Sequence, residues 1–326
     1  MRVLLLAASI MLWVEAPVAA ETPYPERSVT VVVPFAAGGG SDTIFRAIAE
    51  ELRTILGRPF VVENRTGADG ILGLAMVHKA APDGYTLLVG NVISNGSTPV
   101  VDKDKLSFDV DAAFDIVSPL ADGPPTILAA SKAELPVNTL KEFIAYVRQN
   151  PGRIRFGSAG MGSSTLLDIA KLARQQGLKF VHVPSVGGGS QLLNDLVSGD
   201  LHVSFVNAAT VAPYIRNGDL TGLAVVGDNR LEDLDVPTFA EQGYPDIGTL
   251  LWHALFAPAK TPERIKQKLF DAVQEALKRP RVQALMKSSY FIPVHVETRG
   301  EAQVWREAAQ ARIRDLIAHT PVSDLE

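Results

Sequence analysis

The residue types that perform catalysis are present in this chain of 326 residues, but they do not occur at catalytic spacings. There is no cysteine, which excludes thiolate nucleophiles, thiolate metal ligands and disulfides together. The six histidines are scattered without a His-x-x-x-His pair, so the sequence predicts no zinc site. His182 and His202 stand among alternating apolar residues, where a satisfied core histidine is the simpler interpretation.

The sequence also lacks the usual motifs of hydrolases and nucleotide-binding proteins. Ser158 has Phe156 two positions before it, where the nucleophile elbow Gly-x-Ser-x-Gly requires glycine. The P-loop pattern Gly-x-x-x-x-Gly-Lys-Ser/Thr does not occur, and no Gly-x-Gly-x-x-Gly follows an expected strand. We therefore expect a protein that is not an enzyme and that carries no cofactor and no metal.

The strongest binding signal is a glycine-rich loop near the N-terminus. Residues 29–33 are apolar and β-branched, as in a buried parallel strand, and Pro34 ends the hydrogen-bonding ladder. Residues 38–40 are all glycine, which lets a ligand approach the backbone without a Cβ atom in the way. Ser41 or Asp42 is expected to cap the helix that follows, and the N-terminus of a helix favours an anion.

The same design recurs further along the chain. A strand at 154–156 leads into the small-residue loop 157–164, and a strand at 180–183 leads into the loop 184–190, each before a helix. Helix capping alone would explain the serines and aspartates, but it does not require the runs of glycine, which open backbone amides to an anion. The short polar side chains expected at such junctions are Ser41, Asp42, Ser158, Ser163, Ser164 and Asn207.

The sequence leaves the role of two charged residues in the first loop open. The carboxylate of Asp42 would repel an anion, so it either caps the helix or orders a water or an amide. Arg46 is the nearest cation, and a solvated helix face is its simpler interpretation. Core packing is the default for the aromatic residues Phe35 and Trp252, although Phe35 directly precedes the loop and could also form a wall of a ligand cleft.

Composition limits the class of protein and its partners. The first 20 residues combine one positive charge, a short apolar run and small residues before Glu21, as in a cleaved signal peptide rather than a membrane anchor. A net charge of −5 without a basic run argues against nucleic acid or anionic membranes as partners. The remaining length exceeds one ordinary core, so we expect two domains in a soluble, exported monomer.

Strands at 29–33, 60–63 and 85–89 alternate with two helices and predict a parallel βαβαβ unit. Residues 90–119 are expected to form a loop, and its segment 91–95 joins the candidate site because open α/β sheets bind ligands at strand carboxyl ends. Strands and helices resume at Thr126, and residues 227–237 are interpreted as a linker.

Several short motifs, in this order along nearly the whole chain, resemble the extracytoplasmic solute receptors of the tripartite tricarboxylate transporter family, often called Bug proteins. They are PFAAGGGSD at 34–42, VENRTGA at 62–68, APDGYTLL at 81–88, NPG at 150–152, GSAGMGS at 157–163, HVP at 182–184, DVPT at 235–238 and APAKTP at 257–262.

This resemblance implies a type II periplasmic binding protein: two α/β domains joined by two crossover strands, with a ligand cleft between them. Residues 1–20 would be the signal peptide, residues 21–124 and 227–326 the first domain, and residues 125–226 the second. Hinge bending is expected near Thr126 and near Val226.

The resemblance also implies the ligand contacts and the function. The protein would capture a small carboxylate in the periplasm, through backbone amides and water, and deliver it to a membrane permease of the tripartite tricarboxylate type. A ligand-sensing receptor for a signalling partner and an exported α/β hydrolase are the alternatives. Contacts carried over by position are Phe35, Gly38, Gly39, Ser41 and Asp42 in the first domain, and Ser158, Ala159, Gly160, Ser163 and Asn207 in the second.

Three residues in the second half of the expected pocket depart from the pattern of this family. Many relatives have a histidine where this chain has Leu166, and an aromatic-lysine pair where it has Ser185-Val186. A less polar wall would suit an aromatic or aliphatic monocarboxylate as well as a di- or tricarboxylate.

Overall fold

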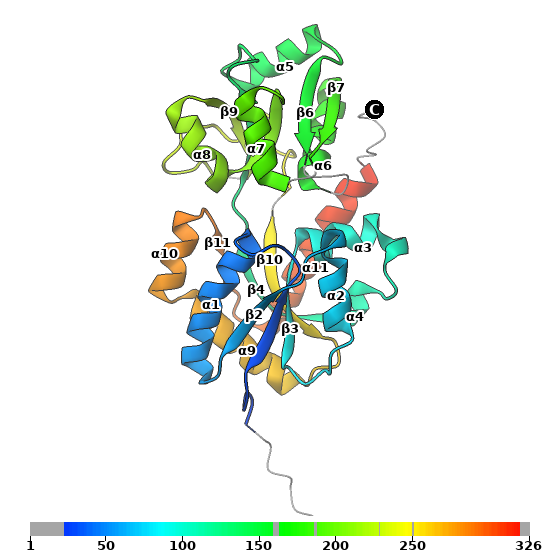
Figure 1. The fold of residues 1–326 in the computed structure, drawn as a ribbon, viewed down its shortest axis with the longest axis vertical. Helices are drawn as coiled ribbons and strands as arrows, with labels where there is room; N and C mark the ends of the chain where they lie inside the picture. The colour runs from blue at the N-terminus through cyan, green and yellow to red at the C-terminus, as the bar shows by residue number, and fades with distance from the viewer. Residues whose placement is uncertain (1–22, 159–162, 186–187, 228, 250, 320–326) are drawn as a thin grey trace, which may run out of the picture.

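A computed structural model describes residues 23–158, 163–185, 188–227, 229–249 and 251–319. Its strands form two separate sheets, each covered by helices, which we call the first and the second lobe (Figure 1). The elements are β1 (Val29–Val33), α1 (Gly40–Leu56), β2 (Phe60–Asn64), α2 (Ile71–His78), β3 (Thr86–Asn91), α3 (Thr98–Val101), α4 (Val110–Ala113), β4 (Phe114–Asp122), β5 (Thr126–Ser131), α5 (Leu140–Gln149), β6 (Ile154–Ser158), α6 (Ser164–Gln176), β7 (Phe180–Pro184), α7 (Gly188–Ser198), β8 (Val203–Asn207), α8 (Ala208–Asn217), β9 (Leu220–Val225), β10 (Trp252–Pro258), α9 (Glu263–Leu277), α10 (Pro280–Ser288), β11 (Ile292–Pro293) and α11 (Arg299–His319).

The six-stranded sheet of the first lobe has the order β11-β4-β10-β3-β1-β2. Strand β1 pairs in parallel with both β2 and β3, so the predicted βαβαβ unit is confirmed. Four of its five residues are fully buried, because helices cover both faces of the sheet, as the continuous apolar run predicts. Helices α1, α9 and α10 pack against one another, and α11 packs against β4.

Residues 90–119 do not form the predicted loop. They contain the π-helical turn Val92–Ser97, the short helices α3 and α4, and most of β4, which pairs antiparallel with β10. Pro119 lies inside β4, which hides the strand in the sequence because proline cannot donate to a ladder. The pairing continues past it through a register shift between His253 and Ala254 of β10.

The five-stranded sheet of the second lobe has the order β7-β6-β8-β5-β9. Strands β7, β6 and β8 run parallel, whereas β5 is antiparallel to both β8 and β9. Two separate clusters of buried apolar side chains pack in this lobe, one containing Phe143 and Phe156, the other Ile127 and Leu196. The carboxyl ends of β6 and β7 carry the predicted second binding loops.

The chain passes between the lobes twice. The first crossing leads from β4 through residues 123–125 into β5, and the second returns to β10. After β9 the chain stays with the second lobe: Val225 bridges to Thr238, and Phe239 and Ile247 are buried in its core. The two crossings meet where the Gly123 N–H donates to the Leu251 carbonyl at 2.5 Å. The predicted domain boundaries stay a prediction.

Helix α11, red in Figure 1, extends from the first lobe toward the second. Among the helices that the structure describes, α11 included, none has both the length and the apolarity needed to span a bilayer.

Candidate functional site

Helix α1 begins at Gly40, with Gly39 as its N-cap and no side chain capping it, so the prediction that Ser41 or Asp42 is the N-cap is wrong. The Thr43 amide donates the first bond of the helix, to the Gly39 carbonyl at 2.9 Å. The amides of residues 40–42 precede that bond and have no acceptor within the helix. Gly38 has φ of +79°, a left-handed conformation that favours glycine. The loop thus presents consecutive backbone donors at a helix N-terminus.

Asp42 is buried and fixes this loop in place. Its carboxylate accepts hydrogen bonds from the Gly38 amide, the Arg46 Nε and the Asn64 Nδ2, each at 2.9 Å. Burial alone would raise the pKa of Asp42, but these hydrogen bonds and the charge of Arg46 outweigh it and hold the pKa below its usual value. Arg46 lies on an exposed face of α1, as its simpler interpretation has it, and from there it also forms an ion pair with Asp42.

Ser41 and Phe35 are held by two asparagines at the ends of neighbouring strands. The Asn91 amide at the end of β3 donates to the Ser41 Oγ at 3.3 Å, and Asn64 at the end of β2 donates to the Phe35 carbonyl at 3.0 Å. Asn91 also caps the π-helical turn that follows β3. The structure thus brings Phe35, Gly38, Gly39, Ser41 and Asp42 together on one edge of the first lobe, with the segment after β3 beside them.

The second predicted junction lies where β6 ends. Ser158 is fully buried, and its Oγ lies 2.7 Å from Nε2 of His182 on β7. His182 is half-buried and bonded to this site residue, so it is not simply a core histidine. Ser163 caps α6 by accepting from the Leu166 amide at 3.4 Å. The predicted contacts Ala159 and Gly160 lie outside the described residues.

Asn207 marks a third junction, at the end of β8. Its Oδ1 accepts from the Ala209 amide at 2.9 Å and so caps α8. Asn207 pairs with Thr126, the first residue after the crossing between the lobes. It therefore lies in the second lobe beside the hinge.

His253 is a neighbour of the glycine loop that sequence reasoning missed. It is buried on β10, edge-on to the Phe291 ring at 5.4 Å, and a Cβ atom placed on Gly40 would lie 3.7 Å from its Nε2. Its Nδ1 has no hydrogen-bond partner among the described residues. Burial lowers the pKa of His253 to about 4, so the imidazole is neutral at physiological pH. Only the fold brings residues 40 and 253 together.

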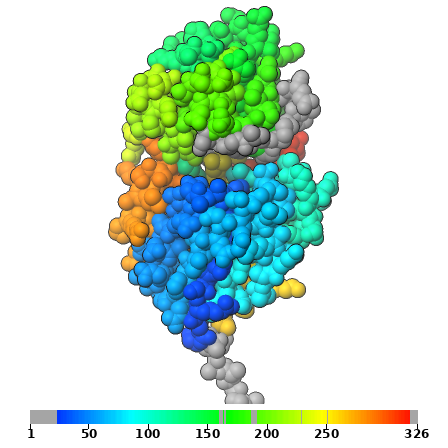
Figure 2. Space-filling model, viewed as in Figure 1, coloured from blue at the N-terminus to red at the C-terminus, as the bar shows by residue number. Residues whose placement is uncertain are grey.

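Figure 2 shows a hollow between the two lobes. Two cavities lie between them: an α10-side cavity of about 620 Å³ that includes Leu231, Met286 and Phe291, and an α11-side cavity of about 480 Å³ that includes Asp168 and Arg312. None of the predicted contact residues that the structure describes lines either cavity.

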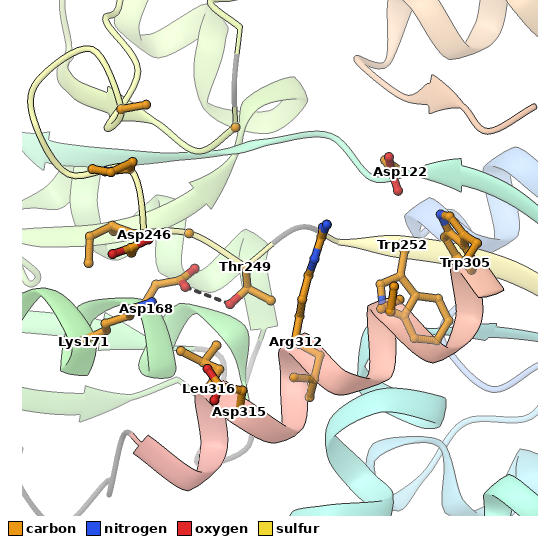
Figure 3. A pocket seen from close by; sticks show the side chains of 18 residues that line it. Asp122, Asp168, Lys171, Asp246, Thr249, Trp252, Trp305, Arg312, Asp315 and Leu316 are labelled. Carbon is orange, nitrogen blue, oxygen red and sulfur yellow. Dashed lines mark hydrogen bonds between the residues drawn. The ribbon is translucent and has the colours of Figure 1, made fainter.

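The α11-side cavity lies beside the two crossings between the lobes, since Asp122 and Thr249 line it. The Thr249 hydroxyl on the returning crossing donates to the Asp168 carboxylate on α6 at 2.8 Å (Figure 3). Burial raises the pKa of Asp168 to about 6, although the bonds from Thr249 oppose this shift. The Arg312 side chain points from α11 into the cavity between Thr249 and Trp252 (Figure 3). Burial raises the pKa of Asp122, which lines the same cavity, and the charge of Arg312 opposes this shift. The α6 helix and the hinge are thus directly coupled.

The described part of the chain contains no cluster of three or more histidine, aspartate or glutamate side chains that could hold a metal ion. Two α/β lobes, two crossings and a hollow between the lobes define the architecture of a type II periplasmic binding protein. Residues 44–320 match the sequence profile of the tripartite tricarboxylate transporter family receptor. The chain belongs to this family of solute receptors, as its motifs predicted.

Individual relatives agree with this assignment. BugT of Bordetella pertussis is 32% identical over 302 residues, which cover 90% of this chain and 91% of BugT. The solved structure of Rpa4515 of R. palustris with adipate has a TM-score of 0.80 and 30% identity, covering 90% of this chain and 97% of that one. MatC of Rhodopseudomonas palustris with bound malate has a TM-score of 0.76 and 32% identity, covering 93% of this chain and all (100%) of MatC.

Proposed function

We propose that this protein is a periplasmic solute receptor that closes its two lobes on a small carboxylate and delivers it to a tripartite tricarboxylate-type permease. The observation that carries the proposal is the start of α1, where the amides of residues 40–42 have no acceptor in the helix. Consecutive backbone donors at the positive end of a helix dipole bind a carboxylate without a cationic side chain.

The electrostatics of the loop are compatible with an anion. Asp42 would repel one, but Arg46 neutralises its charge within the loop, and both carboxylate oxygens already accept hydrogen bonds. The net charge of this cluster is therefore close to zero, and the backbone amides decide what binds. The relatives crystallised with adipate and malate support a carboxylate as the ligand class.

Closure would bend the two crossings between the lobes. We place the first bend at residues 123–125, close to the predicted Thr126, and the second next to Thr249 rather than at Val226. The reason for the second choice is that Phe239 and Ile247 are still buried in the core of the second lobe. A ligand held by both lobes would favour the closed state by its extra contacts there.

A thermal-shift screen over mono-, di- and tricarboxylates tests the proposal. A ligand that binds only the native state raises the melting temperature, and at ~100 times its dissociation constant it adds ~2.7 kcal/mol of stability. We expect at least one carboxylate to raise the melting temperature. The proposal fails if no carboxylate does so and a neutral solute does.

The Ser158–His182 contact favours a second candidate, an exported hydrolase, because it puts a hydroxyl within hydrogen-bond reach of a base. Incubation with p-nitrophenyl acetate and butyrate distinguishes the two candidates. A receptor shows no turnover above that of the Ser158→Ala variant, whereas a hydrolase loses its activity in that variant. If the protein serves a signalling partner instead of a permease, then the purified protein should capture a signalling receptor and not permease subunits.

A further inference from the structure

The α10-side cavity has mainly apolar walls contributed by both lobes. Its volume is about 620 Å³, and Ile292 on its rim is 58% exposed, which is unusual for a large apolar side chain in the described part of this chain. The apolar residues that shape it most are Pro125, Leu231, Leu251, Met286, Phe291 and Ile292.

This cavity adjoins the proposed carboxylate site in both lobes. In the first lobe the Phe291 ring, which lines the cavity, lies so close to α1 that a Cβ atom on Gly40 would be 3.1 Å from its Cζ. In the second lobe the Pro125 carbonyl, also on the wall, accepts from the amide of Ala208, the residue after Asn207. A ligand held by the amides of residues 40–42 would therefore lie close to the Phe291 ring, which is part of the cavity wall.

The cations that line the cavity already have ion-pair partners. Both cations among its described lining residues are already paired: Arg230 with Glu241 at 2.8 Å and with Asp235 at 3.1 Å, and Lys287 with Glu232 at 3.2 Å. The Asp122 carboxylate also lines it; burial raises the pKa of this carboxylate, and the charge of Arg312, which lines the α11-side cavity, opposes the shift. A second carboxylate would be desolvated here among mainly apolar walls and beside the Asp122 carboxylate, and the cations that line this cavity already have partners.

We propose that the α10-side cavity receives the apolar tail of the ligand, so that this receptor selects an aromatic or branched aliphatic monocarboxylate over a dicarboxylate. The single carboxylate binds at the start of α1, and the tail lies past Phe291 between Leu231 and Ile292. This selectivity rests on the proposed function, and it differs from the dicarboxylates adipate and malate found with the two similar receptors.

Calorimetric titration of the mature protein with 3-phenylpropionate, adipate and propionate tests this selectivity. We expect 3-phenylpropionate to bind about tenfold or more tightly than either of the other two, because only its tail buries apolar surface in the cavity. Adipate binding as tightly as, or more tightly than, 3-phenylpropionate overturns the inference and leaves the proposed function intact. If no carboxylate binds at all, the proposed function fails with it.

A variant on the cavity wall separates the tail site from the carboxylate site. Ile292→Ser is expected to weaken 3-phenylpropionate binding about fivefold, since it removes apolar contact, and to leave propionate binding unchanged. Val304→Ser on α11 is the matched control, because Val304 is 65% exposed and does not line the cavity. Equal affinity of the Ile292→Ser variant and the wild type for 3-phenylpropionate would also overturn the inference.

Discussion

The guanidinium of Arg46 lies 2.9 Å from the carboxylate of Asp42, one turn earlier on the same helix. This pair occupies the position where a binding protein could have exposed a cation to its ligand. Here the cation neutralises a buried carboxylate, and the carboxylate in turn holds the Gly38 amide and Asn64. Side chains therefore hold the loop in place, and the groups left to bind a ligand are the backbone N–H groups of residues 40–42.

Replacing Asp42 by alanine should loosen the loop without unfolding the protein. The change removes the acceptor shared by Gly38, Arg46 and Asn64, and we expect it to lower the free energy of unfolding by about 1–3 kcal/mol. Carboxylate affinity should fall about tenfold, since disordered amides must be ordered on binding. Calorimetry and urea unfolding measure both effects. Asp104→Ala removes an exposed carboxylate outside the site and should change neither.

Replacing Ser158 by alanine should weaken binding from the second lobe. The variant loses the 2.7 Å contact between the Ser158 Oγ and Nε2 of His182, which links the ends of β6 and β7. We expect carboxylate affinity to fall about fivefold, in line with the loss of one buried hydrogen bond. Ser198→Ala, an exposed serine at the end of α7, is the control in the same titration. An unchanged dissociation constant for Ser158→Ala would remove Ser158 from the site.

The Asp168→Asn variant should be more stable than the wild type at neutral pH. Between the ordinary value of 3.8 and about 6, native Asp168 holds a proton that the unfolded chain has released, so its contribution to stability falls as the pH rises. Asparagine can still accept from Thr249 and carries no charge. We expect a gain of about 1–3 kcal/mol at pH 7.5 and none at pH 4, measured by urea unfolding. A gain that does not vary with pH would contradict the assignment.

His253 should contribute a pH dependence of the opposite sign. Between pH 6.5 and about 4 the unfolded chain binds a proton that native His253 does not, so the wild type loses stability as the pH falls through this window. His253→Gln cannot be protonated and should lack this loss, which amounts to about 2–3 kcal/mol. Thermal unfolding from pH 7 to pH 4 compares the two slopes. Parallel curves would show that His253 is not buried in its neutral form.

The parts of the fold that follow local rules could be predicted from the sequence. Strand β1 is buried on both faces and is therefore apolar throughout, which identifies it without tertiary information. Strand β4 could not be recognised, because Pro119 interrupts it and only a register shift against the distant β10 lets it pair. The prediction that Asp42 caps α1 failed for a similar reason. The Asp42 carboxylate instead accepts a hydrogen bond from Asn64, which belongs to the next strand, β2.

In the candidate site, too, the parts that follow local rules could be predicted from the sequence. Glycines and hydroxyl side chains in the loop after a strand indicate where backbone N–H groups will be exposed. This pattern can be read from the sequence at residues 38–41. The α10-side cavity has no such signal, because Pro125, Leu231 and Phe291 lie far apart in the chain and each looks like an ordinary apolar residue. Its shape depends on how the two lobes are placed, which no local pattern encodes.

The hydrogen bond from the Gly123 amide to the Leu251 carbonyl extends the antiparallel pairing of β4 and β10 by one residue, from Asp122 and Trp252 into the two crossings. The two connections between the lobes are therefore tied to each other where they leave the sheet of the first lobe. We expect them to bend together when the lobes close, because bending one crossing alone would break this bond.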